Sequence, residues 1–372
     1  MSKAWNRAFC ALLIVFIAAL FCINLVSPDR EFSDMENRVL AQKPAFSFSA
    51  LFSGKWTAAY ETYLTDQFSF RDSWVAMKYL CERALLKKEN NGIYFADNGM
   101  LISRFDAPKK ERVDKNFEAV EALAQSSGLP TRLMLVPTAA YVYRDALPKN
   151  APSYDQQKLL DRAAGLQNAS YVDVSAVLKE HRGDALYYRT DHHWTTSGAY
   201  LAYCAYMNTL GRGEEIVSRE TLEGLKKELP DFYGTLYSQS GARFIKPDTI
   251  TYYDFPGVTM QQPEKQPVSI YDLSFAEKKD KYAVFFGGNP PLFTMKSQAP
   301  GAHGKLMVIK DSFANSLLPY LSQNFAEIEV FDPRYNRQSA AEAAKAFGAD
   351  QILVLYQTAN FASDVNIGLL GA

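Results

Sequence analysis

Two short segments of the chain hold side chains that could carry out nucleophilic catalysis. The first runs from Tyr188 to Thr195 (YRTDHHWT) and the second from Val308 to Asn315 (VIKDSFAN). A serine hydroxyl is a weak nucleophile unless a histidine accepts its proton, and a carboxylate in turn orients that histidine. Ser312, His193 and Asp191 supply these three groups. The two segments together therefore predict a Ser-His-Asp triad.

The Asp-x-His spacing predicts how the first segment presents its side chains. Residues two apart in an extended segment point to the same side, so we expect Asp191 and His193 to project together and His192 to point away. A curve at Asp191 would let its carboxylate bind one imidazole nitrogen and leave the other for Ser312. The two segments are distant in sequence, so their meeting depends on the fold.

Other interpretations of these residues stay open at this point. A His-His pair beside an aspartate could bind a metal, although adjacent histidine side chains are expected to diverge and no third histidine lies nearby. The pair could also be structural, and Ser312 could be an ordinary helix N-cap. The occurrence of both segments in one chain favours the triad, with no metal and no cofactor.

An acyl-transfer site also needs N–H donors for the oxyanion that forms during the reaction. The backbone N–H of Ser312 is the first candidate, because a helix N-terminus stabilises negative charge. A glycine-rich turn supplies others, since Gly288 permits close backbone approach and the side chain of Asn289 donates N–H. The same residues also suit an ordinary turn before Pro290, and Asn315 is an alternative donor.

Strands and helices alternate around these segments. Apolar runs predict strands at 93–95, 100–102, 131–136, 171–174, 305–309, 327–331 and 351–356, and helices at 115–126, 197–210, from 314 and at 339–347. The alternation predicts an α/β fold with a mostly parallel sheet covered by helices on both faces. Ligands bind such sheets at the carboxyl ends of the strands, where Ser312 follows the strand at 305–309. Residues 211–300 are less regular and look like an insertion.

A long apolar run lies near the start of the chain. From Ala8 to Val26, nineteen positions carry no charge, and Lys3 and Arg7 precede them. This length spans a bilayer as a helix, and the flanking positive charges favour a cytoplasmic N-terminus. The run ends without the small residues of a signal-peptidase site, which favours an uncleaved signal anchor over a cleaved signal or a buried helix. The bulk of the chain then lies outside the cytoplasmic membrane.

These patterns predict three parts. Residues 1–27 form a signal anchor or transmembrane helix, residues 28–90 a membrane-proximal helical segment, and residues 91–372 a catalytic domain with an insertion at about 211–300. Only Cys81 and Cys204 lie in the exported part, so one disulfide or two free thiols are both open.

The balance of charged residues indicates which classes of partner the protein could bind. The 372 residues include 40 Lys+Arg and 41 Asp+Glu, for a formal net charge of −1. A nucleic-acid binder would show a basic excess, so no nucleic-acid partner is expected. Near-neutral charge is compatible with a sugar polymer. With only 4 His in the chain, two adjacent histidines are notable.

The run TDHHWT at 190–195, followed by SGA at 197–199, resembles the signature of DHHW-family proteins. These are similar to periplasmic alginate O-acetyltransferases, whose catalytic domains are SGNH-hydrolase-like. Their aspartate and histidine precede the serine, in the reverse of the ordinary SGNH esterase order, as they do here. The resemblance covers roughly residues 30 to 372, and its other matching pieces are DQF at 66–68, NGML at 98–101, VPT at 136–138 and DPRYN at 332–336.

The resemblance implies an SGNH-hydrolase-like three-layer sandwich in which Ser312 is the nucleophile, His193 the base and Asp191 its orienting partner. It implies an O-acyltransferase, specifically an O-acetyltransferase, that modifies a polysaccharide and receives its acyl group from a multi-span membrane acyltransferase. Two departures are His192 between the aspartate and the histidine, and Lys310 where a small residue is usual. Nothing identifies alginate as the polymer.

Two other functions use the same features. A carbohydrate esterase would employ the same triad with water as the acyl acceptor, and a glycan-binding or assembly component would carry a vestigial one. For sugar contacts the candidate residues are Tyr233, Arg334 and Tyr335.

Overall fold

The computed structural model describes residues 3–33 and 38–371, and the chain forms two units. The first unit comprises residues 1–87 with 238–243, and the second comprises residues 88–237 with 244–372. Residues 1, 2 and 34–37 of the predicted anchor and membrane-proximal segment, and residue 372 of the predicted catalytic domain, lie outside the described residues.

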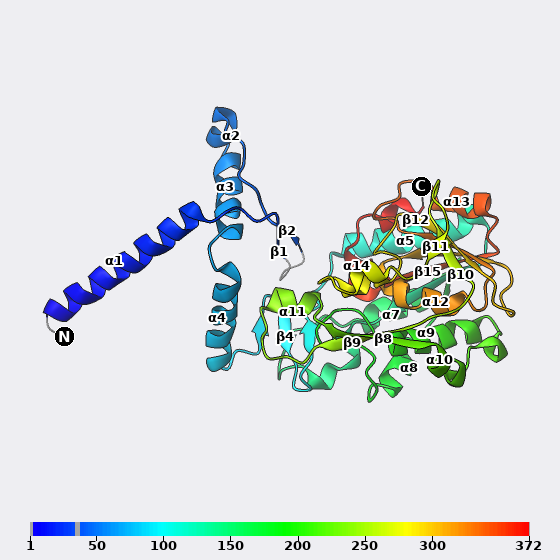
Figure 1. The fold of residues 1–372 in the computed structure, drawn as a ribbon. Helices are drawn as coiled ribbons and strands as arrows, with labels where there is room; N and C mark the ends of the chain where they lie inside the picture. Colours follow the sequence, from blue (N-terminus) through cyan, green and yellow to red (C-terminus); the bar gives the residue numbers. More distant parts are fainter. Residues whose placement is uncertain (1–2, 34–37, 372) are drawn as a thin grey trace. The chain divides into compact units, whose positions relative to one another are not determined.

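The first unit is mainly helical (Figure 1). Its elements are α1 (Lys3–Val26), β1 (Phe32–Ser33), β2 (Arg38–Val39), α2 (Phe48–Phe52), α3 (Lys55–Asp66) and α4 (Arg71–Ala84). Helix α1 is long and apolar enough to cross a membrane, and no residue of it is buried. The asparagine near its end, Asn24, accepts hydrogen bonds from the backbone N–H of Ser69 at 2.8 Å and from its hydroxyl at 2.9 Å.

An eight-stranded sheet forms the centre of the second unit, in the order β11-β10-β12-β14-β13-β15-β6-β7. The strands are β6 (Thr131–Val136), β7 (Ser170–Tyr171), β10 (Val258–Gln261), β11 (Val268–Ser269), β12 (Leu292–Ser297), β13 (Lys305–Lys310), β14 (Glu327–Phe331) and β15 (Gln351–Gln357). From β14 to β7 all neighbours are parallel, and β12, β10 and β11 add an antiparallel edge. The predicted mostly parallel α/β sheet is confirmed.

Helices cover both faces of this sheet (Figure 1). They are α5 (Lys110–Ser127), α6 (Ala139–Val142), α7 (Gln157–Ala164), α8 (Ser175–Glu180), α9 (Thr196–Thr209), α10 (Arg219–Leu225), α12 (Leu318–Leu321), α13 (Ala340–Phe347) and α14 (Thr358–Ser363). The short helix α11 (Thr235–Ser240) has residues in both units. Alternate residues of one strand enter opposite cores: Val308 joins the core that includes α9, and Met307 joins the core that includes α5. Burial on both faces explains why these strands are apolar throughout.

Two small antiparallel sheets complete the second unit. They are β3 (Glu89–Asn90) with β4 (Ile93–Phe95) and β5 (Leu101–Ser103), and β8 (Lys226–Phe232) with β9 (Asp248–Tyr253). The hairpin expected around residues 93–102 is present as β4 and β5.

Two local expectations were wrong. The strand expected at 171–174 stops at Tyr171, because Asp173 accepts a hydrogen bond from the backbone N–H of Ser175 and begins α8. The helix expected from Ala314 begins as a 3₁₀ turn over Ser312–Ser316, since Pro319 lacks the N–H that a continuous α-helix would need. Residues 211–300 also supply β10, β11 and β12 to the central sheet.

Helix α9 directly follows the segment from Tyr188 to Thr195, and Gly198 lets the helix and this segment pack closely. A Cβ atom at Gly198 would lie 2.6 Å from the backbone oxygen of Leu186 and 3.3 Å from Cβ of Trp194. Only glycine therefore fits at position 198, where the first turn of α9 packs against Leu186 and Trp194.

We expect Gly198→Ala to lower the free energy of unfolding by about 1–3 kcal/mol, the usual cost of overpacking a buried site. Gly224→Ala is the matched control, because Gly224 lies in α10 with no atom within 4 Å of an added Cβ. That change should be neutral or stabilise by up to about 1 kcal/mol. Urea unfolding measures both, and equal effects of the two changes would contradict this packing argument.

Candidate active site

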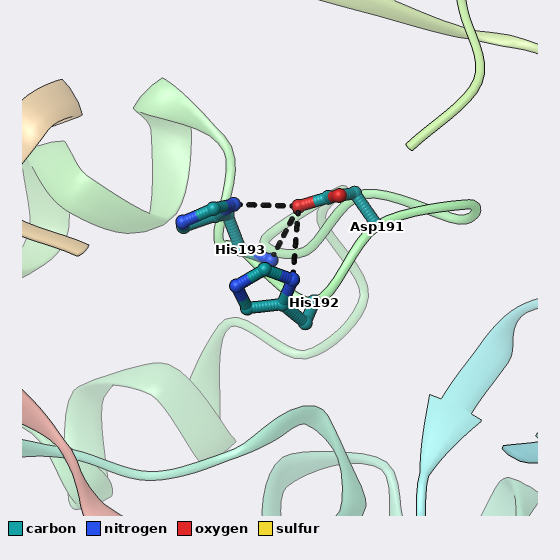
Figure 2. Close-up of side chains that lie close together, drawn as sticks. All are labelled: Asp191, His192 and His193. Atoms are coloured by element: carbon teal, nitrogen blue, oxygen red, sulfur yellow. Dashed lines mark hydrogen bonds and ion pairs between the residues drawn. The ribbon is translucent and has the colours of Figure 1, made fainter. Parts of the chain in front are cut away.

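Asp191, His193 and Ser312 form a continuous hydrogen-bonded chain. His193 Nδ1 lies 2.6 Å from Asp191 Oδ1, and the backbone N–H of His193 donates to the same oxygen at 2.9 Å (Figure 2). On the other side of the ring, His193 Nε2 lies 2.8 Å from Ser312 Oγ, although the two residues are 119 positions apart. The fold thus brings together the three residues that the sequence singled out.

Ser312 stands immediately beyond the carboxyl end of β13, and the buried Asp311 holds this turn. One carboxylate oxygen of Asp311 accepts from the backbone N–H of Phe313 at 2.9 Å. The other accepts from the backbone N–H of Gln357 at 3.0 Å and from Asn360 Nδ2 at 2.7 Å. Burial raises the pKa of Asp311, and the hydrogen bond from Asn360 opposes that rise. Ser312 keeps 9% of its surface exposed.

Two aromatic residues join the histidine segment to the serine turn. Trp194, fully buried, donates from Nε1 to the backbone oxygen of Phe313 at 2.8 Å. Tyr282 stacks on the His193 ring with centroids 3.9 Å apart, and its hydroxyl donates to the backbone oxygen of Ser312 at 3.3 Å. The sequence held no signal for Tyr282, because it lies in the irregular stretch between residues 211 and 300.

The carboxylate of Asp191 is almost fully buried and is matched by donors from a second loop. Its Oδ2 accepts from the backbone N–H of Thr235 at 2.7 Å and from the Thr235 hydroxyl at 3.0 Å. Burial alone would raise the pKa of Asp191, but the His192 and His193 imidazoles and these hydrogen bonds outweigh it and hold that pKa well below its usual range. Asp191 is therefore ionised at neutral pH and can stabilise a charged His193.

Glycine is required at position 234 for this contact. A Cβ atom there would lie 2.2 Å from Cβ of Asp191. Thr235 and Gly234 were both missed by the sequence analysis, because their role depends on a contact across more than forty positions.

The expectation that His192 points away from Asp191 was wrong. The two histidine rings lie with centroids 3.9 Å apart, and His192 Nδ1 is 3.6 Å from Asp191 Oδ1 (Figure 2). Residues 190–193 form a succession of bends, so the alternation of an extended segment does not apply. His192 Nδ1 also lies 2.8 Å from the hydroxyl oxygen of Thr235.

These contacts assign the proton on His192. Thr235 gives its one hydroxyl proton to Asp191, so its oxygen must accept from His192 Nδ1–H. Burial, with repulsion from the neighbouring His193 imidazole, lowers the pKa of His192 to about 4. The ring is therefore neutral at pH 7, and its Nε2 is a hydrogen-bond acceptor on a side chain that is 31% exposed. Figure 2 shows the far nitrogens of both rings turned away from Asp191.

Asp191, His192 and His193 also place one potential metal-ligand atom each within 4.8 Å of one another. The Asp191 oxygens and both histidine Nδ1 atoms already take part in hydrogen bonds. A cation would have to displace those protons and break the contact that orients His193, so the absence of a metal stays our prediction.

The candidate oxyanion donors fall into two groups. The backbone N–H of Gly288 donates to the backbone oxygen of Phe285 at 3.1 Å, so this N–H is engaged within its own turn. Asn315 Nδ2 lies 3.3 Å from the backbone oxygen of Gly288 and is engaged as well. Among the described residues, the backbone N–H of Ser312 and Nδ2 of Asn289 make no hydrogen bond. These two remain as candidate donors.

Of the residues suggested for sugar contact, Tyr233 lies beside the site. It directly precedes Gly234 and is half-buried, and its ring centroid lies 4.6 Å from that of Tyr237. Arg334 instead makes a two-pronged ion pair with the buried Asp332, at 2.9 and 2.6 Å. Tyr335 is 60% exposed, with the Arg334 guanidinium 5.4 Å from its ring.

The sequence profile of the DHHW protein family matches residues 111–331. The chain belongs to this family. A solved DHHW family protein from Eubacterium siraeum is 25% identical, with a TM-score of 0.62 over 76% of this chain and 95% of its own. PatB1 from Bacillus cereus is 21% identical, with a TM-score of 0.59 over 73% of this chain and 97% of its own. No curated protein matches the chain.

The comparisons confirm the resemblance and the fold that it implied. The DHHW family protein and PatB1 share the α/β architecture over nearly their whole lengths. The mostly parallel sheet of this DHHW protein carries Ser312 just beyond the carboxyl end of β13, where open α/β sheets bind their ligands.

We expect Thr235→Val to lower kcat/KM for an activated acetyl ester by about 10- to 100-fold, because Asp191 loses a hydrogen bond worth about 1.5–3 kcal/mol. Thr235→Ser is the matched control, since it keeps the hydroxyl that contacts Asp191 and His192. Ester turnover and the thermal unfolding midpoint are measured for both. If valine and serine at this position give equal rates, the hydroxyl has no part in orienting the triad.

Proposed function

We propose that this DHHW protein is an extracytoplasmic O-acyltransferase, specifically an O-acetyltransferase, that modifies a cell-surface or secreted polysaccharide. The observation that carries the proposal is the contact of 2.8 Å between His193 Nε2 and Ser312 Oγ, with Asp191 hydrogen-bonded behind the ring. That arrangement is the one a serine needs to become a nucleophile.

The first half-reaction forms an acyl-enzyme. His193 Nε2 takes the hydroxyl proton as Ser312 Oγ attacks the carbonyl carbon of the acyl donor, and the carbonyl oxygen becomes an oxyanion. When the bond to the leaving group breaks, the imidazolium returns that proton to the leaving group. Asp191 stays ionised throughout and stabilises the imidazolium.

The second half-reaction transfers the acyl group. A sugar hydroxyl gives its proton to His193 Nε2 and attacks the carbonyl carbon of the ester on Ser312. The bond to Ser312 Oγ breaks, and the imidazolium reprotonates that oxygen. Water in place of the sugar would make the protein a carbohydrate esterase, which is the second candidate, and a vestigial triad in a glycan-binding component is the third.

Two features beside the triad suit a sugar acceptor. Tyr233 and Tyr237 form a half-buried aromatic pair next to the loop that holds Asp191, and aromatic faces pack well against sugar rings. The neutral His192 offers an acceptor nitrogen for a sugar hydroxyl on a partly exposed ring. Both suit a polysaccharide substrate.

The first helix supports the proposed location. Helix α1 has the length and apolarity of a membrane span, and Lys3 and Arg7 at its start favour a cytoplasmic N-terminus. We infer a single-pass anchor that holds the catalytic part outside the membrane, next to a multi-span membrane acyltransferase that delivers the acyl group.

We expect full-length protein in detergent to hydrolyse an activated acetyl ester slowly and to transfer the acetyl group to added oligosaccharides faster. Ser312→Ala should lower both rates by about 10⁴-fold or more. Ser316→Ala is the matched control: Ser316 is a buried serine in the same turn, and its hydroxyl contacts Tyr282 rather than His193. It should keep most of the activity.

The outcomes separate the three candidates. Product analysis by mass spectrometry would show acetylated oligosaccharide for a transferase, and free acetate regardless of acceptor for an esterase. Glycan binding with no acyl turnover in the wild type, or full activity in Ser312→Ala, would reject both enzymatic candidates.

An uncleaved anchor predicts that the mature protein in membranes keeps its N-terminal residues. Intact-mass measurement should find the full chain, and alkaline carbonate should leave it in the membrane fraction, because about 20 apolar residues anchor a helix stably. Loss of residues 1–27 from the mature protein would instead establish a cleaved signal.

A further inference from the structure

Lys310 places a buried amine two residues before the proposed nucleophile Ser312. Its side chain is 0% exposed, and Nζ donates to Asn289 Oδ1 and to Asn315 Oδ1, both at 2.8 Å. Asp332 Oδ2 lies 3.8 Å away. A buried ammonium group is unfavourable unless such partners surround it, and the triad itself does not use this one.

The sheet topology brings these groups to one edge. Lys310 is the last residue of β13, and Asp332 follows β14. Because the two strands are parallel, both residues lie at the carboxyl-terminal ends of the strands, where Ser312 also lies. Asn289 precedes β12, which runs antiparallel to β14. The start of β12 therefore lies at the same edge.

The contacts of Lys310 define which way two side-chain amides face. An asparagine amide has an acceptor oxygen on one side and an NH₂ group on the other. Since Lys310 binds both oxygens, both NH₂ groups must face elsewhere. Asn315 Nδ2 is taken up by the backbone oxygen of Gly288 and by Asn289 Oδ1, each at 3.3 Å. Nδ2 of Asn289 has no partner among the described residues, and its side chain is only half-buried.

We infer that Lys310 is a positioning residue, which holds the amide of Asn289 so that its Nδ2–H group donates to the oxyanion formed at Ser312. This inference rests on the proposed acyl transfer. The backbone N–H of Ser312 is the second donor. The charge on Lys310 also polarises the amide that it binds, which strengthens the donor at the other end.

The inference carries a pH dependence. Burial lowers the pKa of Lys310 to about 8, with attraction to Asp332 and Asp311 opposing it and repulsion from Arg334 adding to it. No charged residue occurs in the turn at 286–292 that holds Asn289. As the pH rises through 8 the amine loses its charge, so kcat/KM should fall on the alkaline side.

The test is a double-mutant cycle on the full-length protein in detergent, with an aryl acetyl ester as the substrate. Asn289→Ala should lower kcat by about 10²- to 10³-fold, the effect of removing an oxyanion donor, with little change in KM. Lys310→Met should lower kcat by about 10- to 100-fold and abolish the alkaline fall, because charge-assisted orientation of that donor is lost. The double variant should be no slower than Asn289→Ala. Lys305→Met is the control and should resemble the wild type, because Lys305 lies in the same strand but forms a half-exposed ion pair with Glu327.

Several results would overturn the inference. Effects of the two changes that multiply would mean that Lys310 does not act through Asn289, as would an alkaline fall that persists in Lys310→Met. If the unfolding midpoint shows that Lys310→Met does not fold, the pH profile of Asn289→Ala alone tests the inference. This variant keeps the lysine, but its kcat/KM should no longer fall at alkaline pH. Wild-type turnover with an unimpaired Lys310→Met would reject this inference alone, whereas no turnover in the wild type would reject the proposed function with it.

Discussion

The buried carboxylate of Asp191 is the constraint on which the site depends. An ionised group without water needs hydrogen-bond donors on each of its oxygens. His193 supplies two to one oxygen and Thr235 supplies two to the other. Meeting that requirement brings the loop at 233–235 against the loop at 190–194, and it leaves room only for glycine at position 234. The orientation of His193 toward Ser312 follows from it.

A second set of buried charges lies at the carboxyl edge of the sheet. Asp311 is satisfied by the last residue of β15 and by Asn360 beyond it, and Lys310 by groups that precede β12 and follow β14. Each charge is thus matched by residues at the ends of other strands of the sheet. The serine turn can keep its geometry only while these strands stay in register, which couples the site to the stability of the sheet.

Apolar runs in the sequence predicted the central parallel strands β6, β13, β14 and β15, because residues buried on both faces of a sheet are apolar without interruption. The runs that become β6 and β14 begin and end where expected. The antiparallel edge formed by β10, β11 and β12 was not predicted, since short edge strands carry mixed polar and apolar residues. His192 was misplaced because alternation holds only in extended backbone, and residues 190–193 bend repeatedly.

The sequence by itself determined which groups could do chemistry, their order along the chain, the long apolar run near its start and the family. These are properties of local residue patterns, and they named Asp191, His193 and Ser312. Only the tertiary structure decided that His193 contacts Ser312 and that Thr235 donates two hydrogen bonds to Asp191. It also decided that the backbone N–H of Gly288 is already hydrogen-bonded. Such facts depend on contacts between residues far apart in the chain, and hydrogen-bond direction and burial exist only after those residues have packed together.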